Sequence, residues 1–276
     1  MKSVNYKNHY SITAPQQSNQ LTNGQANRAT TTKAAATTTT VPVAENSTPK
    51  VKQPELAAKI IKQSSIICFD VDSTVIVEEG IDELADFCGK GDEVARVTKE
   101  AMGGAMTFQD ALKVRLDIIR PTQKQIADFI KLRPSTLTHN VKRFMAQLKA
   151  EGKQIYLISG GFDCLIEPVA SELDIPMSHL YANKLMFYNN GDYAGFDTTQ
   201  PTSKSGGKSV AIALIKHKQQ QQQHSTDALI TMIGDGATDL EAVPPADYFI
   251  GFGGNVQRAA VFAKSQYYVT DFAQLM

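Results

Sequence analysis

Four short apolar runs constrain the fold of this chain more than any other feature, because each run stops abruptly at polar or glycine residues. Each has the length and composition of a buried strand. They are residues 66–69 before Asp70, residues 154–158 before Ser159-Gly160-Gly161, residues 229–233 before Gly234-Asp235-Gly236, and residues 248–250 before Gly251. Helix-like stretches lie between them, at residues 137–150, 164–173 and 208–217. This alternation predicts an α/β fold, a mostly parallel sheet with helices on both faces.

The segment after the first run breaks this rhythm. Helical patterns follow one another without a strand-like run between them, at residues 81–88, 94–101, 108–119 and 123–131. We therefore predict a helical insert, or cap, at about residues 78–135. Further on, the apolar stretches 181–188 and 193–196 flank a short polar turn, which predicts a β-hairpin.

Residues 1–53 differ in composition from the rest of the chain. They are rich in Thr, Gln, Asn and Ala, and they hold six of the 28 basic residues but one of the 28 acidic ones, Glu45. The tail therefore carries about +5 and the remaining 22 basic and 27 acidic residues about −5. So few large apolar side chains cannot offset the entropy of ordering, which predicts a disordered tail at 1–53 and a folded domain at 54–276. The alternative is a plastid or mitochondrial transit peptide, because the tail is poor in acids.

Several classes of protein are disfavoured. The net charge of zero gives no signal for nucleic acid or an anionic membrane. Three cysteines cannot make a disulfide framework, and they match no zinc spacing, so a reducing compartment is expected. No apolar run approaches the roughly 18–20 residues of a membrane span, and no signal peptide is visible. We predict a cytoplasmic location and no nucleic-acid or membrane partner. The sequence does not indicate the oligomeric state.

A run of five glutamines at residues 219–223 is the second low-complexity stretch. It follows a helix-like stretch and precedes a strand-like one. We predict an exposed loop insertion there, with recruitment of a partner protein as the alternative.

The polar residues after the strands carry the predicted chemistry. In open α/β sheets, ligands bind beyond the carboxyl ends of the strands, so these residues are expected to converge. They are Asp70, Asp72, Ser73, Thr74, Ser159, Gly160, Gly161, Lys208, Asp235, Thr238 and Asp239. Four carboxylates a few Å apart repel one another by about 1–4 kcal/mol per pair, which favours a bound cation. Mg²⁺ prefers oxygen ligands and often bridges to phosphate, and lysine and glycine amides suit an anion. The combination points to phosphoryl transfer.

Asp70 is then the expected nucleophile, since a carboxylate attacks phosphorus to form an aspartyl-phosphate. Asp72 is the expected acid and base, which protonates the leaving alkoxide and later deprotonates the attacking water. A lone Asp-x-Asp is more often a cap or turn, and a lone Ser-Gly-Gly is most often a turn. The joint occurrence of these motifs, in order and at strand ends, is what favours catalysis.

Together these motifs resemble the four motifs of the haloacid dehalogenase superfamily. Within it, the chain looks most like the phosphoserine phosphatases, over about residues 54–276. The closer resemblance lies in residues 70–84, 101–105, 191–200 and 251–256. It implies a Rossmannoid parallel-sheet core with an inserted helical cap. It also implies Mg²⁺-dependent hydrolysis of O-phospho-L-serine to L-serine and phosphate through an aspartyl-phosphate, the last step of phosphorylated serine biosynthesis.

The resemblance also implies a role for each motif residue. Asp70, the backbone carbonyl of Asp72, and Asp235 are the implied Mg²⁺ ligands, with Asp239 nearby. Ser159, Gly160, Gly161 and Lys208 are the implied phosphoryl-binding residues. The implied contacts to the rest of the substrate are Glu79 for the ammonium, Arg115 for the carboxylate, Met102 and Gly103 in a closing loop, and Thr238 and Arg258.

Three of these substrate residues also have a simpler interpretation. Glu79 and Arg115 could be solvated charges on helices, and Met102 could be core packing. Two other functions remain open at this point: a phosphatase for another small phosphate ester, and an interaction protein on a phosphatase scaffold. Glu79 and Arg115 favour an amino-acid substrate, whereas the interaction protein would be expected to lack a catalytic residue, and none is missing.

Overall fold

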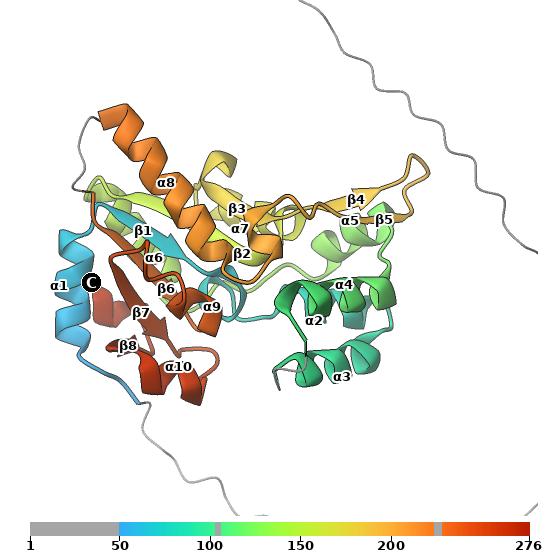
Figure 1. Ribbon diagram of the computed structural model, residues 1–276, viewed down its shortest axis with the longest axis horizontal. Helices are drawn as coiled ribbons and strands as arrows, with labels where there is room; N and C mark the ends of the chain where they lie inside the picture. Colours follow the sequence, from blue (N-terminus) through green and yellow to red (C-terminus); the bar gives the residue numbers. More distant parts are fainter. Residues whose placement is uncertain (1–49, 103–105, 224–227) are drawn as a thin grey trace, which may run out of the picture. The chain divides into compact units, whose positions relative to one another are not determined.

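A six-stranded parallel sheet lies at the centre of the computed structural model, which describes residues 50–102, 106–223 and 228–276 (Figure 1). The strand order is β3-β2-β1-β6-β7-β8, and every neighbouring pair is parallel. The strands are β1 (Ile66–Phe69), β2 (Gln154–Phe162), β3 (Leu180–Asn183), β6 (Ile230–Gly234), β7 (Tyr248–Phe252) and β8 (Tyr267–Val269). The predicted α/β class is thereby confirmed.

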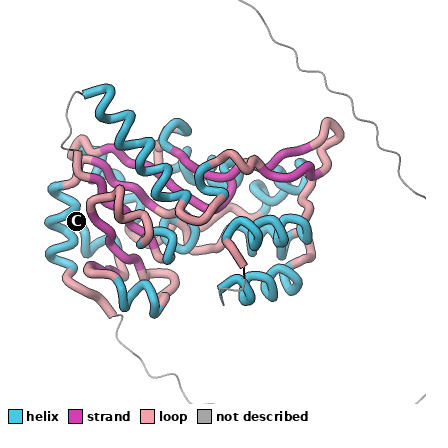
Figure 2. The backbone as a smooth tube through the Cα atoms, viewed as in Figure 1, coloured by secondary structure: helices cyan, strands magenta, loops and turns pink. Residues whose placement is uncertain are grey.

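Helices lie on both faces of the sheet (Figure 2). The side chains of the central strand β1 alternate between these two faces. Ile67 and Phe69 belong to an apolar cluster with α1 (Pro54–Gln63), α6 (Val141–Ala150) and α7 (Asp163–Glu172). Ile66 and Cys68 belong to a second cluster, on the opposite face, with α8 (Gly207–Gln223) and α10 (Ala259–Lys264). β1 is the third of the six strands, so the chain leaves it at Asp70 near the middle of the sheet edge.

The segment between β1 and α6 is helical. It begins with a single π-type turn at Val71–Val75 and continues with α2 (Gly80–Phe87), α3 (Gly91–Met102), α4 (Phe108–Ile119) and α5 (Gln123–Leu132). Thr107 caps α4 and Thr122 caps α5, each by accepting a hydrogen bond from a backbone N–H of the first turn. These helices enclose apolar clusters of their own, against which the antiparallel hairpin β4 (Leu185–Phe187) and β5 (Tyr193–Phe196) packs. That they act as a cap stays a prediction.

The sheet differs from its predicted form in three places. β2 continues through Ser159, Gly160 and Gly161 to Phe162, so the glycines end a strand instead of forming a separate loop. The first arm of the predicted hairpin divides at Lys184, because β3 joins the parallel sheet while β4 pairs with β5. β8 was not predicted at all, since it has three residues.

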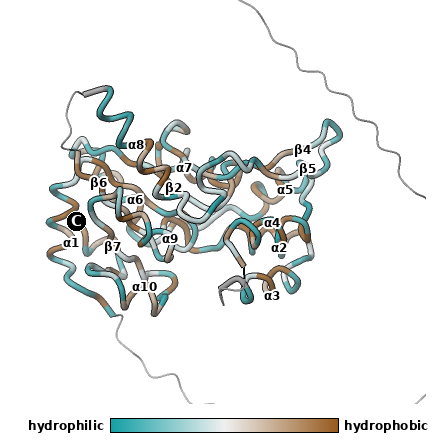
Figure 3. Tube along the Cα trace, in the orientation of Figure 1, coloured by the Kyte–Doolittle hydropathy of each residue, from teal (hydrophilic) through white to brown (hydrophobic). Residues whose placement is uncertain are grey.

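The prediction of a glutamine loop is wrong. α8 continues through the run to Gln223, because glutamine is a good helix former. Gln219 lies eight residues after Ala211 and four after Ile215, and it is buried like them. Its amide exchanges hydrogen bonds with that of Gln154, at the start of β2. Figure 3 shows that this end of α8 is hydrophilic.

Among the described residues no helix is both long and apolar enough to cross a membrane.

Candidate active site

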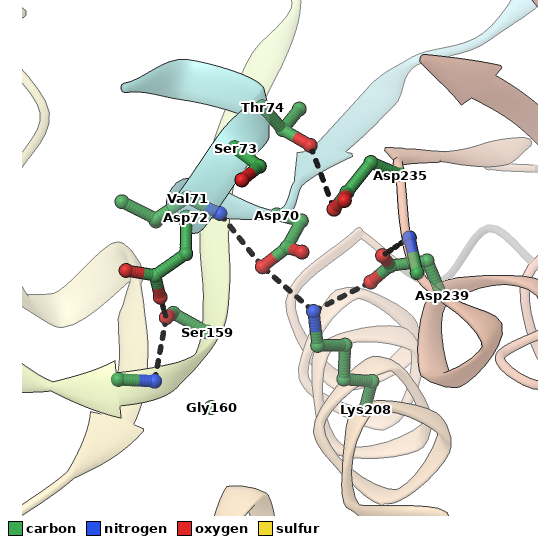
Figure 4. A network of polar contacts seen from close by, with 12 residues as sticks. Asp70, Val71, Asp72, Ser73, Thr74, Ser159, Gly160, Lys208, Asp235 and Asp239 are labelled. Atoms are coloured by element: carbon green, nitrogen blue, oxygen red, sulfur yellow. Dashed lines mark hydrogen bonds and ion pairs between the residues drawn. The ribbon is translucent and has the colours of Figure 1, made fainter. Parts of the chain in front are cut away.

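The polar residues predicted to converge meet at the carboxyl edge of three neighbouring strands (Figure 4). β1 lies between β2 and β6 in the sheet. Asp70 directly follows β1, Asp235 directly follows β6, and Ser159 lies near the end of β2. Lys208 enters from the first turn of α8, and Asp239 from the short helix α9 (Ala237–Leu240). This placement follows from the parallel sheet, in which all strands end at the same edge.

Asp70 is held by two hydrogen bonds at one oxygen. Its Oδ1 accepts a hydrogen bond of 2.7 Å from the backbone N–H of Val71 and lies 2.7 Å from Nζ of Lys208. The residue is 7% exposed. Its carboxylate is therefore fixed, while a small part of it still faces the solvent-accessible edge of the sheet.

The carboxyl of Asp72 points toward Ser159 and away from Asp70 (Figure 4). Asp72 lies in the turn Val71–Val75, where the next residue, Ser73, has a left-handed φ of 54°. Oδ1 of Asp72 accepts a hydrogen bond of 2.8 Å from the N–H of Gly80, and its Oδ2 one of 3.0 Å from the hydroxyl of Ser159. Burial, together with the charges of Glu79 and Asp70, raises the pKa of Asp72 to about 7, although these two hydrogen bonds oppose the shift. A carboxyl with this pKa exchanges protons near neutral pH.

Three buried carboxylates form a compact acidic cluster. Asp70, Asp235 and Asp239 each offer an oxygen, and these oxygens lie within 4.8 Å of one another. Burial and the charge of Asp70 raise the pKa of Asp235 to about 6 and hold that of Asp239 well above its usual range. A side chain at Gly234 would collide with Asp239, so glycine is needed there. Buried oxygen donors that resist ionisation together fit a hard divalent cation.

Lys208 partly neutralises this cluster. Its Nζ lies 2.7 Å from Asp70 and 2.5 Å from Asp239, and the residue is 6% exposed. Burial alone would lower the pKa of the ammonium, but Asp239 and Asp70 outweigh it and raise the pKa. The amine therefore stays charged at neutral pH.

Two glycines at the end of β2 allow close approaches. The hydroxyl of Ser159 accepts a hydrogen bond of 2.8 Å from the N–H of Gly161. A Cβ at Gly160 would lie 2.8 Å from the ring of Phe108 in α4, and one at Gly161 would lie 2.9 Å from Oδ2 of Asp72. A side chain at either position would therefore force Phe108 or the carboxyl of Asp72 to move.

The predicted substrate residues Glu79 and Arg258 contact each other. Nη2 of Arg258 donates a hydrogen bond of 2.8 Å to Oε1 of Glu79, and Nε donates one of 2.7 Å to Asp235. Arg115 lies apart from this pair and donates to the backbone carbonyl of Ala111 at 3.2 Å. Burial lowers the pKa of the Arg115 guanidinium, although the negative charges of three carboxylates act to raise it. These carboxylates are Asp82, Glu79 and Asp72.

For three other predicted substrate residues, the structure shows no side-chain contact with the site. Thr238 is half-buried in α9 and makes no side-chain hydrogen bond within the described residues. Met102 is the last residue of α3, and Gly103 lies outside the described residues. The closing loop predicted for Met102 and Gly103 is thus not described.

Sequence reasoning placed Ser73 and Thr74 at this edge of the sheet without giving either a role, and it missed Asn255. Ser73 donates a hydrogen bond of 2.9 Å to Glu79, and Thr74 donates one of 3.5 Å to Asp235. Asn255 donates to the carbonyls of Ser73 and Ile76 from the loop after β7. Nothing in the local sequence pattern singles out Asn255.

Comparisons with known proteins agree with this geometry. The family model of haloacid dehalogenase-like hydrolases matches residues 67–243. A phosphoserine phosphatase of Drosophila melanogaster is 71% identical over 234 residues, which cover 85% of this chain and 84% of the relative. One of Homo sapiens is 50% identical, over 79% of this chain and 94% of its own. A solved structure described as a phospho-aspartyl intermediate analogue of phosphoserine phosphatase matches with a TM-score of 0.63 at 25% identity. The match covers 77% of this chain and 97% of that one.

Proposed function

This chain belongs to the haloacid dehalogenase-like hydrolase family, and we propose that it acts in that family as a phosphoserine phosphatase. It hydrolyses O-phospho-L-serine to L-serine and phosphate, the last step of phosphorylated serine biosynthesis. The observation that carries the proposal is the meeting of Asp70 with Asp235, Asp239 and Lys208 at one edge of the sheet. A nucleophilic carboxylate beside a cation site and a buried ammonium suits phosphoryl transfer.

Asp70, Asp235 and the backbone carbonyl of Asp72 would hold the divalent ion, which we propose to be Mg²⁺. When bound, Mg²⁺ neutralises charge on the phosphoryl oxygens and on the carboxylates. Asp239 accepts hydrogen bonds from Lys208 and from the N–H of Gly236, so we propose that it positions Lys208 and does not bind the ion directly.

Asp70 attacks phosphorus. A bond forms between its carboxylate oxygen and the phosphorus, and the bond between phosphorus and the serine oxygen breaks. Protonated Asp72 gives its proton to the departing serine alkoxide. Ionised Asp72 then takes a proton from a water that attacks the aspartyl-phosphate, which releases phosphate and restores Asp70. The pKa of about 7 at Asp72 supports both roles.

The transferred phosphoryl group requires donors. We assign this part to Lys208, to the hydroxyl of Ser159 and to the amides of Gly160 and Gly161. Lys208 is charged and already touches the nucleophile, and the hydroxyl of Ser159 lies between Gly161 and Asp72. Such donors stabilise the charge that develops on the phosphoryl oxygens.

The amino-acid part of the substrate requires one anion and one cation. Glu79 would bind the ammonium and Arg115 the carboxylate, for which a planar guanidinium is suited. Met102, Gly103, Thr238 and Arg258 are proposed as further contacts. The helical segment of about residues 78–135 is then the cap over the substrate, since it carries both Glu79 and Arg115.

A cytoplasmic location is also part of the proposal, with import into a plastid or mitochondrion through residues 1–53 as the alternative. Tagging the full-length chain and a chain that starts near Lys52 separates the two. A full-length chain in an organelle beside a truncated chain in the cytoplasm would contradict the cytoplasmic proposal.

Phosphate release from L-phosphoserine tests the function, with and without Mg²⁺. Phosphothreonine, phosphoglycolate and p-nitrophenyl phosphate are the comparison substrates. The proposal predicts Mg²⁺-dependent release that strongly favours phosphoserine. Release from the other esters but not from phosphoserine would keep the chemistry and reject the substrate, and no release from any of them would reject the enzyme.

A further inference from the structure

Strand β2 carries a bulge at the residues proposed to bind the phosphoryl group. The register with β3 shifts between Ile158 and Phe162, where residues 159–161 lie opposite Ala182 alone. A bulge leaves backbone groups of the longer strand without a partner in the ladder, and bulges are frequent beside active sites. The backbone of residues 159–161 is therefore less constrained by the sheet, and other contacts must hold it in place.

Asn183 supplies one such contact. It is the last residue of β3 and is completely buried. Its Nδ2 donates a hydrogen bond of 2.8 Å to the carbonyl of Gly160, and its Oδ1 accepts one of 3.0 Å from the hydroxyl of Thr202. The orientation of the amide is fixed, because a carbonyl can only accept and the NH₂ group must therefore face Gly160. Both polar atoms of Asn183 are thus paired.

The contact with Gly160 extends to the catalytic edge through one peptide group. The carbonyl of Gly160 and the N–H of Gly161 belong to the same planar peptide. That N–H donates a hydrogen bond of 2.8 Å to the hydroxyl of Ser159, and the hydroxyl donates one of 3.0 Å to Asp72. Hydrogen bonds in such a chain polarise and strengthen one another. Asn183 therefore fixes the orientation of the peptide on which the contacts of Ser159 depend.

The contact with Thr202 extends to the other side of the phosphoryl site. Thr202 is buried in the short 3₁₀-helix η3 (Pro201–Ser203). Helix α8 begins directly against η3, since a Cβ at Gly207 would collide with the backbone carbonyl of Pro201. Lys208 is the next residue of α8. Asn183 thus joins the two segments that carry the proposed phosphoryl donors.

We propose that Asn183 is a positioning residue for phosphoryl binding. It fixes the Gly160–Gly161 peptide and, through Thr202, the start of α8, so that Ser159 and Lys208 face the same phosphoryl group. The inference rests on the proposed function, which assigns these donors to that group. A misplacement of about 1 Å in an active site can reduce the rate about 100-fold, even when the substituted residue does not touch the substrate.

Asn183→Leu tests this role, because it keeps the approximate size of the side chain and removes both polar atoms. We expect kcat/KM to fall by about 10–100-fold for phosphoserine and for p-nitrophenyl phosphate alike, since both esters carry the same phosphoryl group. Binding of inorganic phosphate to the full-length chain, measured by calorimetry with Mg²⁺ present, gives a readout without turnover. Its affinity should fall by about tenfold, the scale of one hydrogen bond.

Thr231→Val is the matched control for the loss of a buried hydrogen bond. The hydroxyls of Thr231 and Ser64 pair at 2.7 Å, and both residues are buried. Thr231 lies near the start of β6, at the end of that strand remote from Asp235. This variant should lower the melting temperature and leave kcat/KM and phosphate affinity at the wild-type values.

Thr202→Val is a second test variant, which serves if Asn183→Leu does not fold. It keeps the shape of the side chain and removes the donor to Oδ1 of Asn183, so the amide is held less firmly. We expect kcat/KM to fall by about 2–10-fold on both esters.

The outcomes are distinct. Wild-type phosphate affinity in a folded Asn183→Leu protein overturns the inference, even if its melting temperature is lower. A loss confined to phosphoserine also overturns it, because Asn183 would then act on the amino-acid part of the site. If Thr202→Val alone folds, unchanged kcat/KM on both esters overturns it. A wild type that hydrolyses neither ester and binds no phosphate would reject the proposed function, and the inference with it.

Discussion

Arg258 donates a hydrogen bond of 2.8 Å to Glu79, although 179 residues separate them in the sequence. Arg258 precedes α10 of the sheet domain, and Glu79 precedes α2 of the helical segment. The same guanidinium holds Asp235 at 2.7 Å. One cation therefore engages both the acid proposed for the substrate ammonium and an acid proposed for the metal. Substrate and metal must share these carboxylates with Arg258 or displace it.

Glu79→Gln is expected to raise the KM for phosphoserine by about 10–100-fold, because a charge-assisted hydrogen bond contributes about 1.5–3 kcal/mol. The KM for p-nitrophenyl phosphate, which has no ammonium, should change little. Glu83→Gln serves as the control, since Glu83 pairs with Arg133 at 3.6 Å and is proposed to bind no substrate. Equal losses on both substrates would assign Glu79 a structural role.

Asp70→Asn is expected to reduce phosphoserine turnover by about 10⁴-fold or more, the scale on which loss of an activated nucleophile acts. The amide is a poor nucleophile, and acid quenching after mixing with ³²P-phosphoserine should trap no labelled protein. The wild type, treated in the same way, should carry the label. Appreciable turnover by a folded Asp70→Asn protein would transfer the nucleophilic role to another group.

The pH dependence should follow Asp72, whose pKa is raised to about 7. Its protonated form is needed when the serine alkoxide departs, and that form decreases as the pH rises through about 7. We expect kcat/KM for phosphoserine to fall toward tenfold per pH unit above this value. With p-nitrophenyl phosphate, whose leaving group needs no proton, the fall should be much weaker. The same profile for both substrates would argue against Asp72 as the acid.

Mg²⁺ should raise the melting temperature of the chain, and more at pH 7.5 than at pH 5.5. Burial raises the pKa of Asp235 from 3.8 to about 6, so ionisation of this group disfavours the folded, metal-free state as the pH rises between these values. The cation compensates for that charge. At a concentration 100 times its Kd it stabilises the fold by about 2.7 kcal/mol. Asp235→Asn should lose most of the Mg²⁺-induced increase, and an undiminished increase would place the ion elsewhere.

Lys52 holds the start of the described chain against α10 and β8. Its ammonium donates to the backbone carbonyls of Phe262, Ala263 and Ser265 at the end of α10, and its backbone pairs with Tyr268. We expect Lys52→Met, which keeps the stem, to cost about 1–2 kcal/mol and to lower the melting temperature by about 2–8 °C. Lys50→Met, which alters an exposed neighbour, is the control. Identical melting curves for the two variants would contradict this anchoring role.

The strand-like runs along the chain and their polar ends could be predicted, because the apolar runs before Asp70 and Asp235 are local signals. β8 could not, since its three residues are held by pairing with β7 and by Lys52. The burial of Gln219 was missed for a similar reason: its partner Gln154 is 65 residues away. The contact between Arg258 and Glu79 likewise depends on tertiary packing that no local pattern records.

The pairing of Gln219 with Gln154 also determines how the chain tolerates changes in repeat length. Gln219 is the first glutamine of its run, so codons gained or lost after it alter α8 only beyond the buried amide pair. The register of α8 from Lys208 to Gln219 would be preserved, and with it the contact of Lys208 with Asp70. A change in the length of the glutamine run would therefore alter the outer end of this helix without reaching the acidic cluster at the edge of the sheet.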